Sequence, residues 1–168
     1  MCAAFLALAA WACAFTANAQ PQPDLRALKA FEGCWTGVFA GQNHLRDDRC
    51  FTQVNLGAQW NDVHTVAGAG YGGVSMYAWD PELRRIDVTY YASDGALMRG
   101  YAIAEVDGLS FPDARYIGAD GRVLHLRSRW RFTASDRFEA VTEREEDGVW
   151  TEFMRIVYAR PSADDAHK

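Results

Sequence analysis

Polar and apolar residues alternate along most of the chain, and turn-forming residues interrupt the alternation at regular intervals. The stretch 85–91, Arg-Ile-Asp-Val-Thr-Tyr-Tyr, has a period of two, which is typical of a strand with one buried face. Asp-Gly dipeptides suit the positive φ angles of a type I′ hairpin turn. They occur at residues 94–95, 107–108, 120–121 and 147–148. The pattern therefore predicts consecutive strands joined by hairpins.

Further turn-forming clusters divide the rest of the chain. They lie at residues 40–43, 56–57, 67–70, 80–83 and 134–136. Nine turns imply ten strands, and hairpin-linked strands hide their edges completely by closing into a barrel. We therefore predict an all-β fold, a single antiparallel up-and-down β-barrel of about ten strands. A two-sheet sandwich is the alternative.

Helical spacing of apolar residues is found only at residues 24–31, through Leu25, Leu28 and Phe31. This spacing predicts one short helix ahead of the barrel. No helical pattern of 10–15 residues separates the strands, so a parallel sheet is not expected.

The first nineteen residues carry no charged side chain and end in Ala17-Asn18-Ala19. This pattern is typical of a signal peptide with an A-x-A cleavage site, and a membrane anchor is the alternative. We expect a signal peptide at 1–19, a barrel domain at 20–160 and a polar tail at 161–168. The protein is then periplasmic or secreted, with no membrane span in its mature part.

Composition limits the partners. A chain of 168 residues with 49% hydrophobic and 23% charged residues suits one packed domain. Its net charge of −5 argues against nucleic acid as a partner, because phosphate binding requires a basic surface. The sequence predicts no oligomeric state.

Two cysteines, Cys34 and Cys50, remain after the leader, and disulfides persist in an exported protein. If the first hairpin is centred on residue 42, paired positions sum to 84 and Cys34 lies directly opposite Cys50. We predict a disulfide between them, which places Trp35 on the opposite, inward face. Two unpaired buried thiols are the alternative.

The motif Gly33-Cys34-Trp35, directly after the short helix, resembles the G-x-W signature of calycins, the superfamily of lipocalins and fatty-acid-binding proteins. The stretch 77–81 followed by Ser-Asp-Gly at 93–95 is similar to bacterial exported lipocalin-like domains. The resemblance implies structural roles for Gly33 and Trp35. It also implies that a basic residue of the last strand, here Arg155, packs across Trp35.

Nitrobindins, a neighbouring family, bind haem in such a barrel through a histidine near the C-terminus. The last predicted strand, residues 149–158, contains no histidine, which argues against haem.

Turn lengths predict which side chains face the lumen, because register follows from the turn. A two-residue turn at 94–95 places Tyr90 opposite Arg99 and Val88 opposite Tyr101. A four-residue loop at 81–84 places Tyr77 opposite Val88. The predicted ligand-binding residues of the lumen are Trp35, Phe39, Phe51, Tyr77, Trp79, Tyr90, Arg99 and Tyr101. In the alternative, these side chains simply fill the barrel.

A basic row, His125, Arg127, Arg129 and Arg131, alternates with an apolar row and is expected to face solvent. In the alternative, Arg127 or Arg129 lies inside, pairs with Glu143 or Glu152, and recognises an anionic head group.

Motifs for metal binding or catalysis are not found. The histidines His44, His64, His125 and His167 lack metal-ligand spacing, and there is no G-x-S-x-G motif, so no metal, cofactor or catalytic residue is predicted. The sequence predicts a carrier or sensor for a small apolar or amphipathic ligand. The alternatives are an enzyme using Tyr90, Arg99 and His125 for isomerisation or hydrolysis, and a haem barrel.

Overall fold

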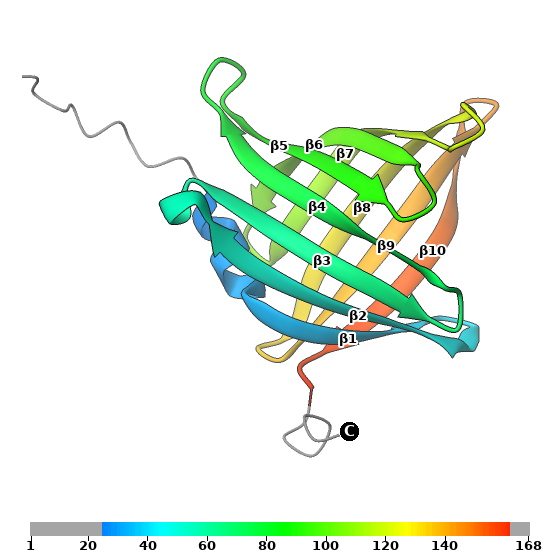
Figure 1. Ribbon diagram of the computed structural model, residues 1–168, viewed down its shortest axis with the longest axis horizontal. Coiled ribbons are helices and arrows are strands. Elements are labelled where there is room, and N and C mark those ends of the chain that lie inside the picture. Colours follow the sequence, from blue (N-terminus) through cyan, green and yellow to red (C-terminus); the bar gives the residue numbers. More distant parts are fainter. Residues whose placement is uncertain (1–24, 162–168) are drawn as a thin grey trace, which may run out of the picture.

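The computed structural model describes residues 25–161, and these form one closed antiparallel barrel of ten strands (Figure 1). The strands are β1 (Gly33–Phe39), β2 (Gln42–Val54), β3 (Gln59–Ala67), β4 (Tyr71–Asp80), β5 (Arg85–Ala92), β6 (Leu97–Glu105), β7 (Gly108–Ile117), β8 (Val123–Ala134), β9 (Arg137–Glu146) and β10 (Val149–Ala159). Each strand pairs with the next, and β1 closes the barrel on β10. The predicted fold is confirmed. The predicted signal peptide and nearly all of the predicted tail lie outside the described residues.

Two short 3-10 helices accompany the strands. The first, η1 (Leu25–Phe31), precedes β1 and corresponds to the predicted short helix, and η2 (Asn55–Gly57) lies between β2 and β3. Neither of the helices within residues 25–161 has the length and apolar character needed to cross a bilayer.

Hairpin loops at two Asp-Gly dipeptides show how turn chemistry sets the register. At 147–148 both residues have positive φ, and Glu146 pairs directly with Val149, as a type I′ turn requires. At the β5–β6 hairpin, the Ala92 N–H donates to the Ala96 carbonyl, and only Gly95 has a positive φ. That loop therefore has one more residue than the turn predicted from the sequence.

The longer loop shifts the β5–β6 register by one residue. Thr89, not Tyr90, pairs with Arg99, and Asp87, not Val88, pairs with Tyr101. Successive side chains of a strand point to opposite faces, so this shift moves Arg99 and Tyr101 to the outer surface. The predicted lumen positions of Arg99 and Tyr101 are therefore wrong. The β4–β5 register, which pairs Tyr77 with Val88, is confirmed.

A disulfide between Cys34 and Cys50 links β1 and β2, with the two Cα atoms 4.0 Å apart. The prediction of this bond is confirmed. The register in which paired positions sum to 84 holds from Gly33 to Val38, but Phe39 pairs with Gln42, so the turn is not centred on residue 42 as predicted. Trp35, on the opposite face of β1, is buried.

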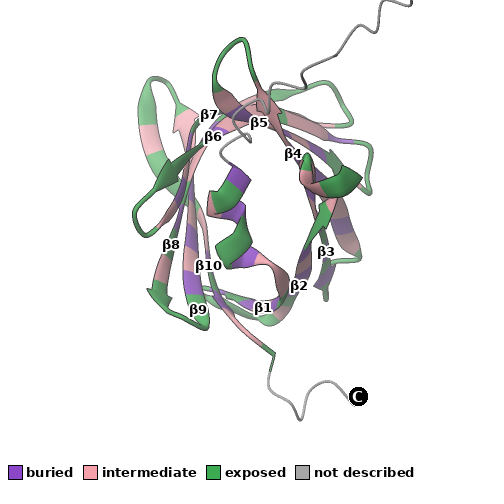
Figure 2. Cartoon of the chain, turned by 90° about the vertical axis from the view of Figure 1, so that its left-hand side faces the viewer, coloured by how far each residue is buried: buried purple, intermediate pink, exposed green. Residues whose placement is uncertain are grey.

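One end of the barrel is closed by η1, which lies inside the ring of strands in Figure 2. Its apolar residues Leu25, Leu28 and Phe31 are buried. Phe31 packs against four aromatic rings at centroid distances of 4.6–5.7 Å, those of Phe51, Trp130, Phe132 and Phe138. The short helix therefore serves as an apolar plug.

The residue that covers Trp35 is Arg160, whose guanidinium carbon lies 3.7 Å from the Trp35 ring centroid. Arg160 also donates to the main-chain carbonyl of Glu32, at the end of the plug. Arg155 instead forms ion pairs with Glu139 and Glu152. The expected packing of Arg155 across Trp35 is wrong, because Arg160, just after β10, reaches the ring instead.

Candidate functional site: a cavity inside the barrel

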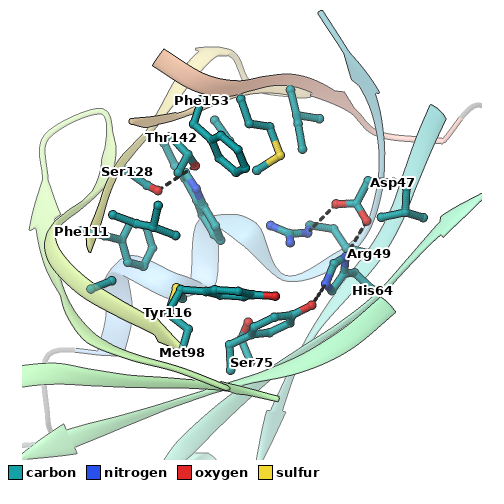
Figure 3. Close-up of a pocket in the computed structure, with 18 of the residues that line it drawn as sticks. Asp47, Arg49, His64, Ser75, Met98, Phe111, Tyr116, Ser128, Thr142 and Phe153 are labelled. Carbon is teal, nitrogen blue, oxygen red and sulfur yellow. Dashed lines mark hydrogen bonds and ion pairs between the residues drawn. The ribbon is translucent and has the colours of Figure 1, made fainter. Parts of the chain in front are cut away.

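Above the plug, the barrel encloses a cavity of about 480 Å³, within the range of small-molecule sites (Figure 3). Most of its wall is apolar. That wall includes Leu45, Val66, Val88, Met98, Phe111, Ala114, Leu124, Leu126, Ala140 and Ile156. Phe153 lines the cavity and is half exposed, so the cavity reaches the surface at the end opposite η1.

The predicted lumen residues separate into three groups. Phe39, Tyr77 and Tyr90 line the cavity. Trp35 and Phe51 are buried in the core beneath it, and Trp79 is half-buried against that core. Arg99 and Tyr101 lie outside, for the reason given above.

A buried charged cluster, consisting of Asp47, Arg49, Asp62 and His64, lies inside the barrel on β2 and β3, and sequence analysis missed it. The predicted register of β1 and β2 could have revealed this cluster. It pairs Arg49 with the inward residue Trp35 and places Asp47 on the same face as Arg49. Pairing of β2 with β3 then brings His64 beside Arg49. The predicted disulfide alone therefore implied two charged residues in the lumen.

Both carboxylate oxygens of Asp47 lie at hydrogen-bond distance from a partner. His64 Nδ1 lies 2.7 Å from Asp47 Oδ1, and the Tyr158 hydroxyl donates to Oδ2 at 2.5 Å. Burial disfavours the charged carboxylate, but the His64 hydrogen bond and the Arg49 charge outweigh it and lower the pKa of Asp47. Asp47 is therefore ionised at neutral pH.

Arg49 is 9% exposed and lies among aromatic rings, 5.1 Å from the centroids of both Trp130 and Tyr158. Its Nε lies 3.4 Å from Asp47 Oδ2 and its Nη2 lies 3.5 Å from Asp62 Oδ2. Burial opposes the charge of Arg49, but the Coulomb attraction of Asp62 and Asp47 outweighs burial and raises its pKa. The guanidinium is therefore a permanent cation at the inner end of the cavity.

Asp62 is completely buried, and neither of its carboxylate oxygens accepts a hydrogen bond within residues 25–161. Burial raises the pKa of Asp62, and the Arg49 charge acts in the opposite direction. Asp62 does not line the cavity and lies behind Arg49.

A chain of hydroxyl groups connects the buried charged cluster to the cavity mouth. His64 Nε2 lies 3.0 Å from the Tyr90 hydroxyl, which lies 2.8 Å from the Tyr71 hydroxyl. The absence of a side chain at Gly73 makes room for Tyr90, because a Cβ there would overlap the Tyr90 ring. Burial raises the pKa of Tyr90 to about 12, so its phenol stays protonated at neutral pH.

The basic row faces outward, as expected. His125, Arg129 and Arg131 are exposed, and Arg127 pairs with Glu143 at 2.6 Å on the outer surface. The alternative with Arg127 or Arg129 inside is wrong, because Leu126 and Trp130 occupy the inward positions of β8. Arg49, and not a residue of the basic row, supplies a cation to the cavity wall.

The three residues suggested for an enzyme do not lie together, since Tyr90 lies inside the barrel while Arg99 and His125 lie outside. Among residues 25–161 no group of three or more histidine, cysteine, aspartate or glutamate side chains is arranged to hold a metal ion. No protein-family model and no curated protein matches the chain.

Proposed function

We propose that this protein binds a small, largely apolar molecule inside its barrel and acts as a carrier or sensor for it. The observation that carries the proposal is the cavity of about 480 Å³, which combines an apolar wall with a few polar groups at its inner end. Binding sites for small molecules have this composition, because apolar area supplies affinity and a few polar groups fix orientation.

The packing of the barrel end near η1 supports the same proposal. Phe31, Phe51 and Phe138 fill the end near η1 and do not line the cavity, which other residues of the same apolar core leave open above them. A barrel that served only as a scaffold would gain stability by filling this volume with larger side chains.

Export and membership of the calycin superfamily belong to the same proposal. The closed ten-strand barrel and the disulfide are compatible with an exported calycin-like protein. N-terminal sequencing of the protein recovered from outside the cytoplasm is expected to begin at Gln20, and a sequence beginning at Met1 would contradict export with cleavage.

Binding is tested by titrating the protein with N-phenyl-1-naphthylamine, an uncharged dye that fluoresces strongly in apolar surroundings. We expect saturable binding of about one dye per chain. Ala114→Phe narrows the cavity, because Ala114 lines it, and is expected to weaken dye binding at least tenfold. The matched control is Ala67→Phe on the outer face of β3, where Ala67 is exposed and pairs with the exposed Arg46, and this variant should bind as the unchanged protein does.

Circular dichroism confirms that both variants are folded. Failure of the folded, unchanged protein to bind the dye, or equal binding by the Ala114→Phe variant, would contradict the proposal. Native mass spectrometry of protein purified from its own host then gives the mass of any bound molecule.

A further inference from the structure

Arg49 is the polar group of the cavity whose bonding is least complete. It lines the cavity and is about nine-tenths buried. A guanidinium carries five N–H donors. Within residues 25–161 its contacts with Asp47 and Asp62, at 3.4 and 3.5 Å, are longer than charge-assisted hydrogen bonds of about 2.7–2.9 Å, and its Nε has no acceptor. Buried donors are normally paired, so this group is suited to an acceptor brought by a ligand.

The charge of Arg49 is already balanced by its neighbours. With His64 neutral, Asp47 and Asp62 together with Arg49 sum to −1 when both carboxyl groups are ionised and to zero when Asp62 is protonated. Neither state offers the excess positive charge that a ligand carboxylate requires, because like charges a few ångströms apart repel strongly in a poorly solvated site. A cationic ligand would be repelled by the guanidinium of Arg49 itself.

We infer that the ligand presents an uncharged carbonyl oxygen to the guanidinium of Arg49, with its apolar part directed toward Phe153 at the mouth. The inference rests on the proposed binding function and names the chemical class of the ligand. The arrangement in Figure 3 favours this orientation, since the Arg49 guanidinium points into the cavity from one side and Phe153 lies at another part of the wall.

The test uses three molecules with eleven-carbon chains, namely 2-undecanone, undecanoate and undecylamine. Each competes with N-phenyl-1-naphthylamine at pH 8, where the carboxylate of undecanoate and the ammonium group of undecylamine are both charged. We expect 2-undecanone to displace the dye at a concentration at least tenfold below those of the two charged molecules.

Any apolar cavity favours a ketone over an ion to some degree, so the decisive quantity is the change of this ratio in Asp47→Asn. Asp47 is ionised, so its replacement makes the surroundings of Arg49 more positive by one charge whether or not Asp62 is protonated, and undecanoate should gain at least tenfold relative to 2-undecanone. The matched control is Asp48→Asn, on the outward face of β2 beside Arg46, which should leave the ratio unchanged.

Infrared spectroscopy tests the contact in the unchanged protein and does not depend on a variant that folds. The carbonyl stretch of bound 2-undecanone, isolated as a difference between carbon-12 and carbon-13 ketone, should lie below its value in hexane, because a hydrogen bond weakens the C=O bond.

Each outcome has one meaning. Binding of the ketone with a hexane-like carbonyl stretch, or binding of undecanoate or undecylamine as tight as that of the ketone, would overturn the inference and leave the binding function standing. An unchanged ratio in a folded Asp47→Asn variant would also overturn it. If the dye and all three molecules fail to bind, the proposed function itself is wrong.

Discussion

The substitution Asp47→Asn tests whether the buried charged cluster stabilises the barrel. Asp47 is 1% exposed, accepts hydrogen bonds from His64 and Tyr158, and lies at ion-pair distance from Arg49. An amide of the same shape removes the charge and replaces one acceptor with a donor that faces other donors. Loss of one partner from a buried ion pair costs about 3–5 kcal/mol, so we expect the free energy of unfolding to fall by that amount. For a domain of this size the melting temperature should fall by roughly 10–15 °C.

Lowering the pH should reproduce part of this loss of unfolding free energy. The pKa of Asp47 in the folded state lies below its value in the unfolded chain, which is about 3.9. Its contribution to stability is therefore complete above about pH 5 and is lost as the pH falls through the folded pKa. Asp47→Asn should show a smaller loss of stability than the unchanged protein over this acid range.

Urea unfolding followed by circular dichroism, from pH 7 down to pH 3, measures both effects. The control is Asp48→Asn, the next residue of β2, whose partly exposed ion pair with Arg46 should contribute less than about 1 kcal/mol. A cost below about 1 kcal/mol for Asp47→Asn at pH 7, or a pH profile parallel to that of the unchanged protein, would refute the reasoning.

Three further predictions concern stability. Replacing Cys34 and Cys50 with serine should lower the free energy of unfolding by roughly 3 kcal/mol, because a loop of this length is no longer closed, and urea unfolding with and without reductant checks this. Gly73→Ala should cost about 1–3 kcal/mol because the new Cβ displaces Tyr90, which tyrosine NMR would detect. Arg160→Met should cost about 2–4 kcal/mol through loss of the contact with the tryptophan ring and of the hydrogen bond to the plug, measured by thermal unfolding.

Controls on the outer surface accompany these variants. Arg155→Met removes exposed ion pairs and should cost less than about 1 kcal/mol. Met76→Leu lies on the exposed face of β4, the strand that carries Gly73, and should be nearly neutral. If Arg155→Met destabilises the protein as much as Arg160→Met does, the role assigned to Arg160 is wrong. The double serine variant should still bind dye, because the disulfide lies outside the cavity.

The sequence predicted the barrel because strand periodicity and turn residues are local properties. It predicted the disulfide from an assumed turn centred on residue 42, whereas the turn lies at residues 40–41 and a register shift between Val38 and Phe39 restores the pairing of Cys34 with Cys50. It failed at Arg99, because Ser93 joins the Asp-Gly pair in a three-residue loop, and one extra residue reverses every inward position of β6. Whether a loop has two or three residues depends on φ angles and hydrogen bonds that the dipeptide alone does not determine.

The candidate site was predictable only in part. Aromatic residues of the lumen follow from alternation, as Tyr77 and Tyr90 do. A buried arginine between two aspartates contradicts the general preference of charged residues for solvent, so Asp47 and Arg49 were overlooked even though their register was correct. Arg160 was missed because the residue that reaches Trp35 lies just beyond the last strand.

Successive hairpin loops lie at alternate ends of the barrel, so the loops around the cavity mouth are at the opposite end from the plug. Loops at residues 40–41, 68–70, 93–96, 118–122 and 147–148 all lie at the end opposite η1, because every second turn of an up-and-down barrel returns to the same rim. The plug and the disulfide lie toward the other end of the barrel, where β1 begins. Length and sequence at the open rim can therefore change without disturbing the plug, the disulfide or Arg49, and under the proposed function such changes would alter the rate of ligand exchange.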